Sequence, residues 1–243
     1  MTGDSKQIVS NQVGVHEHLN HKVERHLLHP FQKPIAAHTQ HVFDELNDHV
    51  KQWQGPVILD ACCGVGESSQ HLAAMFPDAL VVGIDKSACR ISKGIKQEAK
   101  GRYVLARADL NDLWRLIWAA QWPVTRQYIL YPNPWPKSEH LGRRWHGAGV
   151  FPYILATGGI LTVRSNWPIY VAEFAEAVTL AGLPTSSRPF PQAGNQPEPI
   201  TPFERKYWLS GHSSTELEID LTDYHPPAWL VQTKPQLNNS PLS

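Results

Sequence analysis

The 243-residue chain has little cysteine, no excess charge and no long apolar run. Its three cysteines, two of them adjacent at Cys62 and Cys63, are too few for a disulfide framework, and no Cys-x-x-Cys spacing occurs. No apolar stretch approaches the length that spans a bilayer, and the polar N-terminus lacks the apolar core of a signal peptide. We therefore expect a cytoplasmic protein that does not contact a membrane.

Further absences narrow the function. The formal net charge is zero, so any contact with a nucleic acid has to depend on a local basic patch. No Gly-x-Ser-x-Gly sequence occurs, which argues against a serine hydrolase of the α/β type. Histidines gather before residue 30, but no cysteine lies near them and no His-Glu-x-x-His sequence occurs, so we predict no metal site. Nothing in the sequence indicates an oligomeric state.

What is present suggests three parts: an N-terminal extension (1–54), a central domain (55–224) and a C-terminal tail (225–243). Residues 1–34 are polar, and we expect them to be loosely ordered. Between Ala36 and Trp53, apolar residues recur at helical spacing, which predicts a helix that packs on the domain. The tail after Tyr224 is predicted to be extended or disordered.

The central domain alternates short β-rich runs with helical patterns. Strands are predicted at 57–59, 80–84, 102–106, 128–131 and 160–163, with a late edge strand at 216–221. Helices are predicted at 68–75, 89–100, 110–120, about 147–156 and 168–181, and a long proline-rich loop at 182–203. Such alternation predicts an α/β fold with a doubly wound, mainly parallel sheet.

A glycine-containing turn follows the first predicted strand. Gly64 and Gly66 allow a tight turn and a close approach of the backbone to a ligand, at the place where doubly wound sheets bind ligands. The second strand ends at Asp85, where a carboxylate can accept both hydroxyls of a ribose. The sequence therefore predicts that this turn binds a nucleoside-containing cofactor.

Charge distinguishes between the candidate cofactors. A pyrophosphate favours bare backbone N–H groups and positive potential, whereas here Asp60 and Glu67 bracket the turn. S-adenosylmethionine has no phosphate and carries an ammonium and a sulfonium group, which an acidic turn suits. Asp109, after the third strand, can accept a hydrogen bond from the adenine amino group. We predict S-adenosylmethionine as the cofactor, bound by Asp60, Gly64, Gly66, Asp85 and Asp109.

A stiff loop follows the fourth strand. The run Leu130-Tyr131-Pro132-Asn133-Pro134-Trp135-Pro136-Lys137 has three prolines, which fix φ and remove backbone donors. Asn133 and Trp135 stand on this frame, and Lys137, Arg143 and Arg144 follow as candidates for binding phosphates. Trp135 or Trp167 offers a stacking face for an extruded base. An amide, an indole and several cations suit a flat, anion-bearing molecule such as a nucleotide.

The run from Tyr131 to Arg144 resembles a specific element of the bacterial tRNA (guanine-N7)-methyltransferase family, Phe-Pro-Asp-Pro-Trp-x-Lys-x-x-His-x-x-Arg-Arg. The stretch Thr201-Pro202-Phe203-Glu204 is similar to that family's Thr-x-Phe-Glu element. The resemblance covers about residues 55–221. It implies a class I methyltransferase-like Rossmann fold and transfer of a methyl group from S-adenosylmethionine to N7 of a guanine in tRNA.

The resemblance also implies residue roles. Asn133 would be the catalytic residue beside the cofactor, and Lys137, Asn166, Thr201 and Glu204 would contact the substrate nucleotide. The chain departs from the family at Asn133 and Asn166, where the family has aspartates, and at Cys62, which takes a position commonly held by glycine. Guanine N7 has a free lone pair and no proton to remove, so no general base is required. Positive charge develops on the purine, and the neutral amide of Asn133 stabilises it less than a carboxylate would. We therefore predict a slower enzyme or another target.

Two alternatives remain open. Asn133-Pro134-Trp135 is similar to the Asn-Pro-Pro-aromatic loop of methyltransferases that act on exocyclic amines, but the second proline is missing. The two neutral amides and the zero net charge also fit a catalytically weak paralogue that binds S-adenosylmethionine or RNA without transferring a methyl group.

Overall fold

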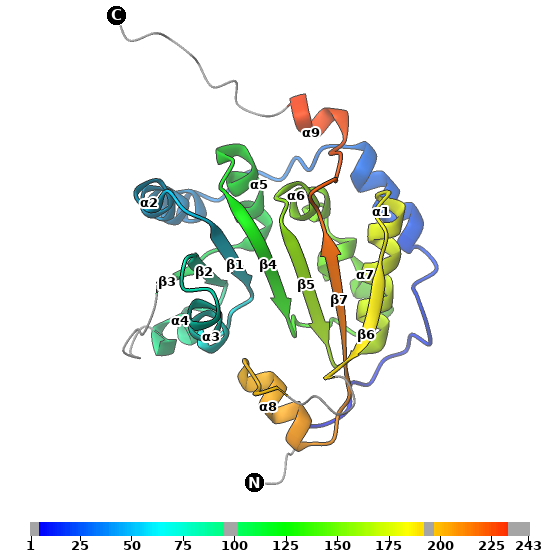
Figure 1. Cartoon of the computed structure of the whole chain (residues 1–243). Helices are drawn as coiled ribbons and strands as arrows, with labels where there is room; N and C mark the ends of the chain where they lie inside the picture. The colour runs from blue at the N-terminus through cyan, green and yellow to red at the C-terminus, as the bar shows by residue number, and fades with distance from the viewer. Residues whose placement is uncertain (1–4, 95–101, 192–196, 233–243) are drawn as a thin grey trace, which may run out of the picture.

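The structure, a computed structural model, describes residues 5–94, 102–191 and 197–232, which form one seven-stranded sheet flanked by helices (Figure 1). The strand order is β3-β2-β1-β4-β5-β7-β6. Neighbours among β1 to β5 are parallel, and β7 pairs antiparallel with both β5 and β6. The strands are β1 (Val57–Ala61), β2 (Leu80–Asp85), β3 (Tyr103–Arg107), β4 (Val124–Leu130), β5 (Ile160–Ser165), β6 (Ser186–Phe190) and β7 (Ser214–Asp220). The predicted doubly wound, mainly parallel sheet is confirmed.

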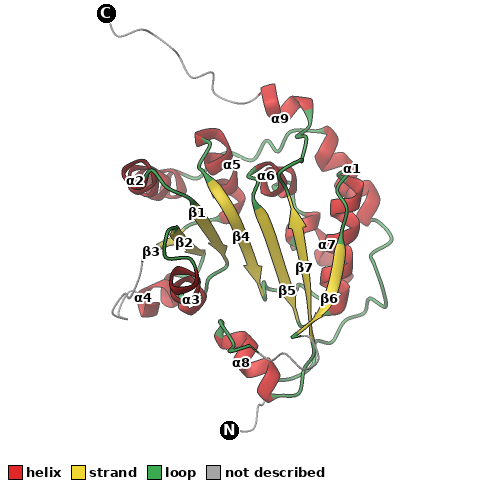
Figure 2. Cartoon of the chain, in the orientation of Figure 1, coloured by secondary structure: helices red, strands yellow, loops and turns green. Residues whose placement is uncertain are grey.

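Helices lie on both sides of the β1–β2 part of the sheet, whereas one face of β5, β7 and β6 has no helix over it among the described residues (Figure 2). The larger apolar cluster joins one face to α1 (Leu19–Leu28), α2 (Ala37–Trp53), α5 (Leu110–Ala120), α6 (Phe151–Ala156) and α7 (Pro168–Leu180). The smaller cluster lies under α3 (Glu67–Met75) and α8 (Pro202–Leu209). The remaining helices are α4 (Ala88–Gly94), α9 (Ala228–Gln232) and two short 3-10 turns, Ser138–Arg143 and Trp145–Gly147.

The first strand is apolar on both of its faces. Val57 and Leu59 pack into the larger cluster, whereas Ile58, one residue along, belongs to the smaller one. Successive side chains of a strand point to opposite faces, so a strand covered on both sides is a continuous apolar run rather than an alternation. The apolar run ends at Asp60, one residue before the end of the strand.

The predicted loose order of residues 1–34 is wrong for the part that the structure describes. Helix α1 packs beside α7 and α6, and the side chains of Leu19 and Val23 are fully buried. These residues are four apart and so lie on one helical face with the half-buried Leu27. This apolar stripe is narrow and is surrounded by histidines and other polar residues. The overall polar composition of the segment therefore gave no indication of a helix.

Two C-terminal predictions need correction. The proline-rich stretch 182–203 contains strand β6, whose Pro189 is compatible with an edge strand because an edge leaves N–H groups unpaired. Strand β7 is therefore internal, between β5 and β6, rather than at the edge. Beyond Tyr224 the chain forms α9, and the Trp229 indole N–H donates to the Leu27 carbonyl over 2.8 Å, which ties this part of the tail to α1.

Smaller differences concern helix limits. The helix predicted at 89–100 begins at Ala88 and is described as far as Gly94; its later residues lie outside the described ranges. The helix predicted from about residue 147 begins at Phe151, after the 3-10 turn. Among the described residues, no helix is long and apolar enough to cross a membrane.

Candidate active site

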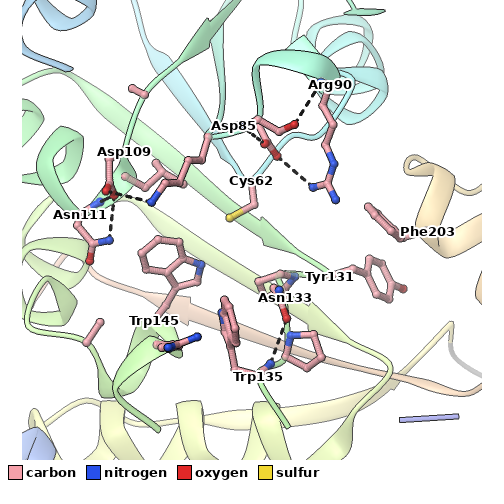
Figure 3. Close-up of a pocket in the computed structure, with 18 of the residues that line it drawn as sticks. Cys62, Asp85, Arg90, Asp109, Asn111, Tyr131, Asn133, Trp135, Trp145 and Phe203 are labelled. Carbon is pink, nitrogen blue, oxygen red and sulfur yellow. Dashed lines mark hydrogen bonds and ion pairs between the residues drawn. The ribbon is translucent and has the colours of Figure 1, made fainter. Parts of the chain in front are cut away.

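A cavity of about 890 Å³ opens at the carboxyl ends of the parallel strands. It lies where the strand order reverses between β1 and β4, which is the usual ligand position in this type of sheet. In Figure 3, Asp85 and Asp109 lie on one side of the cavity, Asn133 and Trp135 on the other, and Cys62 between them. Residues from four separate loops therefore meet at one site.

The turn after β1 is held in a left-handed backbone conformation. Cys62, Gly64 and Gly66 have φ angles of 66°, 62° and 82°. A Cβ atom on Gly66 would meet the Leu105 Cδ1 atom at 2.4 Å, which the leucine side chain could relieve by moving, so the positive φ is what favours glycine there. Neither glycine is among the residues that line the cavity. Their effect on it is to set the path of the turn.

Asp85 links this turn to the end of β2. Its Oδ2 accepts a hydrogen bond from the Gly64 N–H over 3.0 Å, and its Oδ1 accepts one from the Ser87 N–H over 2.7 Å. The Arg90 guanidinium lies 3.6 Å from Oδ2. An ionised carboxylate has about four acceptor positions, so these contacts leave capacity for the hydroxyls of a ligand.

Asp109 is the N-cap of α5 and lines the same cavity. Its Oδ1 accepts hydrogen bonds from the backbone and the side-chain N–H groups of Asn111, and the ammonium groups of Lys33 and Lys86 lie 3.4 and 3.6 Å from its Oδ2. Partial burial disfavours the charged carboxylate, but these hydrogen bonds and cations prevail and lower the Asp109 pKa below its usual range. The carboxylate stays ionised as an acceptor.

Asp60 is not part of the cavity wall, contrary to the prediction of direct cofactor contact. Its side chain is 1% exposed, and its Oδ2 accepts hydrogen bonds from the Ser68 and Ser69 hydroxyls, both at 2.6 Å. Burial raises the Asp60 pKa to about 6, even though the two serine hydrogen bonds oppose the shift. Asp60 supports the start of α3 from below the turn, and its Oδ1 is buried without a partner among the described residues.

The proline-rich loop forms the opposite wall. The Asn133 Oδ1 accepts a hydrogen bond from the Trp135 N–H over 3.2 Å, which closes a small side-chain turn at the cavity mouth (Figure 3). Tyr131 and Trp135 have positive φ angles of 50° and 47°, which are unusual for aromatic residues and indicate local backbone strain beside the cavity. The Arg143 guanidinium stacks over the Trp135 ring at 4.7 Å.

The three basic residues that follow this loop differ in their surroundings. Arg143 is exposed and lines the cavity, whereas Lys137 is exposed and is not a lining residue. Arg144 contradicts the prediction that it meets a phosphate: it is 0% exposed, and its guanidinium donates to Glu173 over 2.6 Å. A basic pair in a sequence resembles a solvated patch, but successive residues of a turn point in different directions, and here one of them points into the core.

The predicted substrate contacts on α8 are also corrected. Thr201 is the N-cap of α8 and accepts from the Glu204 N–H over 2.9 Å. The Glu204 carboxylate is fully buried; it accepts from Arg164 and from the Ile200 N–H, both at 2.8 Å. The Thr-x-Phe-Glu element therefore starts a helix and anchors it to β5. Asn166, half-buried 3.5 Å from the His212 ring, also lies outside the cavity lining.

Comparison with known proteins decides the family. The family model described as "Putative methyltransferase" matches residues 54–217, which is more than half of the chain. The chain belongs to this methyltransferase family. The identification made from the sequence is confirmed.

Several curated relatives of this methyltransferase bear the name tRNA (guanine-N(7)-)-methyltransferase. The protein of Treponema pallidum (strain Nichols) is 27% identical over 172 residues, 67% of this chain and 66% of that protein. The protein of Ruegeria sp. (strain TM1040) is 32% identical over 54% of this chain and 53% of its own length. That of Pseudomonas aeruginosa (strain PAO1) is 24% identical over 74% and 79%. The matched region thus spans from about half to about four fifths of these relatives.

Solved structures support the fold. The 16S rRNA methyltransferase KamB has a TM-score of 0.53 at 17% identity, covering 78% of this chain and 95% of its own. A 16S rRNA (adenine(1408)-N(1))-methyltransferase mutant from Catenulisporales acidiphilia, solved with its cosubstrate SAM, has a TM-score of 0.51 at 18% identity, covering 74% and 93%. The predicted class I methyltransferase-like Rossmann fold is confirmed.

Several cavity residues of this methyltransferase were missed in the sequence. Lys86 directly follows Asp85, and Asn111 lies two residues after the helix cap Asp109. Their place beside the cavity could therefore have been predicted from the sequence. Trp145, which packs edge-on against Trp114 with ring centroids 5.0 Å apart, gave no sequence signal. Two further aromatic residues come from α8, Phe203 and Tyr207. Long-range packing, which no local pattern encodes, brings them to the site.

Two chemical functions gain no support from this site. Burial raises the pKa of the Cys62 thiol to about 12, so this cysteine is a neutral part of the wall rather than a thiolate nucleophile. Within the described ranges, no group of three or more His, Cys, Asp or Glu side chains is arranged to hold a metal ion.

Proposed function

We propose that this chain transfers a methyl group from S-adenosylmethionine to N7 of a guanine in tRNA, in the cytoplasm. The observation that carries the proposal is the meeting of Asp85, Asp109 and the Asn133–Trp135 loop at one cavity. The chain belongs to a methyltransferase family, and its curated relatives are named tRNA (guanine-N(7)-)-methyltransferases. The substrate and partner, tRNA, follow from that likeness and from the cations at the cavity mouth.

The residues present suit S-adenosylmethionine. Asp85 keeps acceptor positions for the two ribose hydroxyls, and the ionised Asp109 can accept from the adenine amino group. When bound, this cofactor would supply an electrophilic methyl group for in-line displacement.

The loop would orient the guanine. Trp135 offers an indole face at the cavity, and Arg143, which covers that face in this structure, is long enough to move to a phosphate when a base stacks there. Asn133 would face the developing positive charge with an amide oxygen, a weaker electrostatic partner than a carboxylate. Because N7 has no proton to lose, these residues need only hold the base in line and stabilise charge.

A second candidate is methyl transfer to an exocyclic amine, which the Asn133-Pro134-Trp135 run favours. In such enzymes the asparagine oxygen accepts from the amino group of the substrate. Here that oxygen already accepts from the Trp135 N–H, which leaves one lone pair for a substrate. We therefore place this candidate after guanine N7.

The test is transfer of labelled methyl from S-adenosylmethionine into unmodified tRNA, followed by digestion and mass spectrometry of the nucleosides. The proposal expects the label in 7-methylguanosine. Label in an N-methylated adenosine or cytidine would favour the amine candidate. Binding of the cofactor without transfer would favour a non-catalytic paralogue and overturn the proposal.

A further inference from the structure

The buried ion pair between Arg144 and Glu173 has no part in the proposed chemistry, yet it lies directly behind the proline-rich loop. Both side chains are 0% exposed, and the Arg144 Nη1 donates to the Glu173 Oε2 over 2.6 Å. Burying two charges is unfavourable unless hydrogen bonds satisfy the rest of their polar atoms. The acceptors of the other guanidinium N–H groups therefore show which part of the structure Arg144 fixes.

Those remaining N–H groups bind the backbone of the loop. Nε and Nη2 donate to the Trp135 carbonyl over 3.2 and 3.1 Å, and Nη2 also donates to the Lys137 carbonyl over 3.2 Å. These carbonyls flank Pro136. Because prolines remove N–H donors, the loop has few backbone hydrogen bonds with which to fix itself. The planar guanidinium supplies them from the core side.

The N-terminal segment completes this anchor. The Gln12 side chain accepts from Arg144 Nη2 over 3.0 Å and donates to the Glu173 carboxylate. Just before Gln12 in the sequence, the Ser10 hydroxyl donates to the Pro136 carbonyl over 2.5 Å, and Asn11 exchanges two hydrogen bonds with Ser138. Residues 10–12, which lie far from the proline-rich loop in sequence, thus fix the C-terminal half of that loop by hydrogen bonds.

Glu173 keeps its charge in this setting. Burial favours the neutral acid, but hydrogen bonds from His146, Arg144 and Gln12 prevail and lower the Glu173 pKa to about 2. The carboxylate therefore orients the Arg144 guanidinium at every pH at which the protein is expected to function.

We propose that Arg144, oriented by Glu173 and Gln12, is a positioning residue that fixes Trp135 and Asn133 at the cavity mouth. It acts through the loop backbone and touches neither cofactor nor base. The inference rests on the proposed function for its effect on methyl transfer, but the anchoring of the loop is independent of what the enzyme methylates. Cofactor binding should be independent of it, since Asp85 and Asp109 belong to other loops.

The first test compares Arg144→Lys with Arg188→Lys, the same substitution at the half-exposed Arg188–Glu216 ion pair on β6, outside the cavity lining. Lysine keeps the charge beside Glu173 but cannot bridge two carbonyls and a carboxylate in one plane. We expect Arg144→Lys to lower kcat for methyl transfer by about 30- to 100-fold, because small displacements of a reacting group have effects of that order. The affinity for S-adenosylhomocysteine should stay unchanged.

The second readout is the rate of tryptic cleavage after Lys137, an exposed residue at the end of the loop. Arg144→Lys should speed this cleavage well before global unfolding, and Arg188→Lys should not. If Arg144→Lys does not fold, Gln12→Ala tests the same anchor, with a smaller effect of the same sign on both readouts.

The outcomes separate the two proposals. Unchanged cleavage and unchanged kcat in a folded Arg144→Lys protein would overturn the positioning role. A loss of cofactor affinity equal to the loss of kcat would also overturn it, because it would indicate a general distortion of the site. Faster cleavage in a chain whose wild type methylates no tRNA would support the anchor while rejecting the proposed substrate.

Discussion

The backbone N–H of Gly64 donates to the carboxylate of Asp85 over 3.0 Å, so the turn after β1 and the end of β2 are fixed to each other. This contact explains how one acid can shape the turn and still face the cavity. It also predicts that a change at Asp85 affects the cofactor more than the fold.

Replacing Asp85 with asparagine should weaken binding of S-adenosylhomocysteine by about 10- to 100-fold, because a hydrogen bond to a charged group contributes about 1.5 to 3 kcal/mol. The single amide oxygen can still accept from the Gly64 N–H, so the turn after β1 should persist, while the Ser87 N–H loses its acceptor. Isothermal titration measures the affinity. Asp78→Asn, a charge change at an exposed residue before β2, is the matched control. Equal affinities of the two variants would contradict the ribose assignment.

Asp60 should make stability depend on pH in a specific direction. Its pKa is raised from 3.8 to about 6, so the folded state binds the proton more tightly than the unfolded state. The penalty is absent below about pH 4, grows as pH rises to about 6 and is complete above that value. Asp60→Asn should remove it and stabilise the protein at pH 7.5 by on the order of 1 to 3 kcal/mol.

Urea unfolding of the wild type and Asp60→Asn at pH 5 and pH 7.5 measures this difference. The comparison between the two proteins isolates Asp60 from every other titrating group. The account requires the variant to gain more at the higher pH. A gain that does not change with pH, or a loss of stability at pH 7.5, would show that Asp60 is charged and stabilising in the fold.

Glu204 should contribute to stability rather than to substrate recognition. Glu204→Gln takes the charge from a buried partner of Arg164, so we expect the free energy of unfolding to fall by about 1 to 3 kcal/mol. Glu218→Gln, on an exposed position of β7, should change it little. If Glu204→Gln left stability unchanged and raised KM for tRNA, the result would instead support the direct contact between Glu204 and the substrate that the sequence predicted.

Asn133 is the position at which the chain can gain activity. Aspartate keeps the oxygen that accepts from the Trp135 N–H, so the loop should be preserved, and it adds a negative charge near the purine. We expect Asn133→Asp to raise kcat by up to about tenfold, since lowering the activation free energy by about 1.4 kcal/mol makes a reaction about tenfold faster. Asn166→Asp, outside the cavity lining, should have a smaller effect. A tenfold loss in Asn133→Asp would mean that the amide itself is required.

The sequence predicted the sheet because the strands are short apolar runs separated by helical patterns, which are local signals. It also predicted that Asp85, Asp109 and Asn133 would converge, since the carboxyl ends of parallel strands share one edge of the sheet. Their roles toward cofactor and substrate remain predictions.

What the sequence did not predict depends on distant partners. Arg144 and Glu204 resembled solvated or substrate-binding charges, and only the folded chain brings Glu173 and Arg164 to them. The N-terminal residues resembled a loose extension because Gln12 and its neighbours are polar, yet their polar atoms satisfy the buried Arg144. Pairing across 29 residues or more leaves no periodic trace that a sequence pattern could report.

The most direct test of the central claim is methyl transfer into two matched tRNA transcripts, one with guanine and one with 7-deazaguanine, which lacks the N7 lone pair. The account predicts 7-methylguanosine from the first transcript and no methylated nucleoside from the second. Equal transfer into both, or none into the guanine transcript, would contradict it.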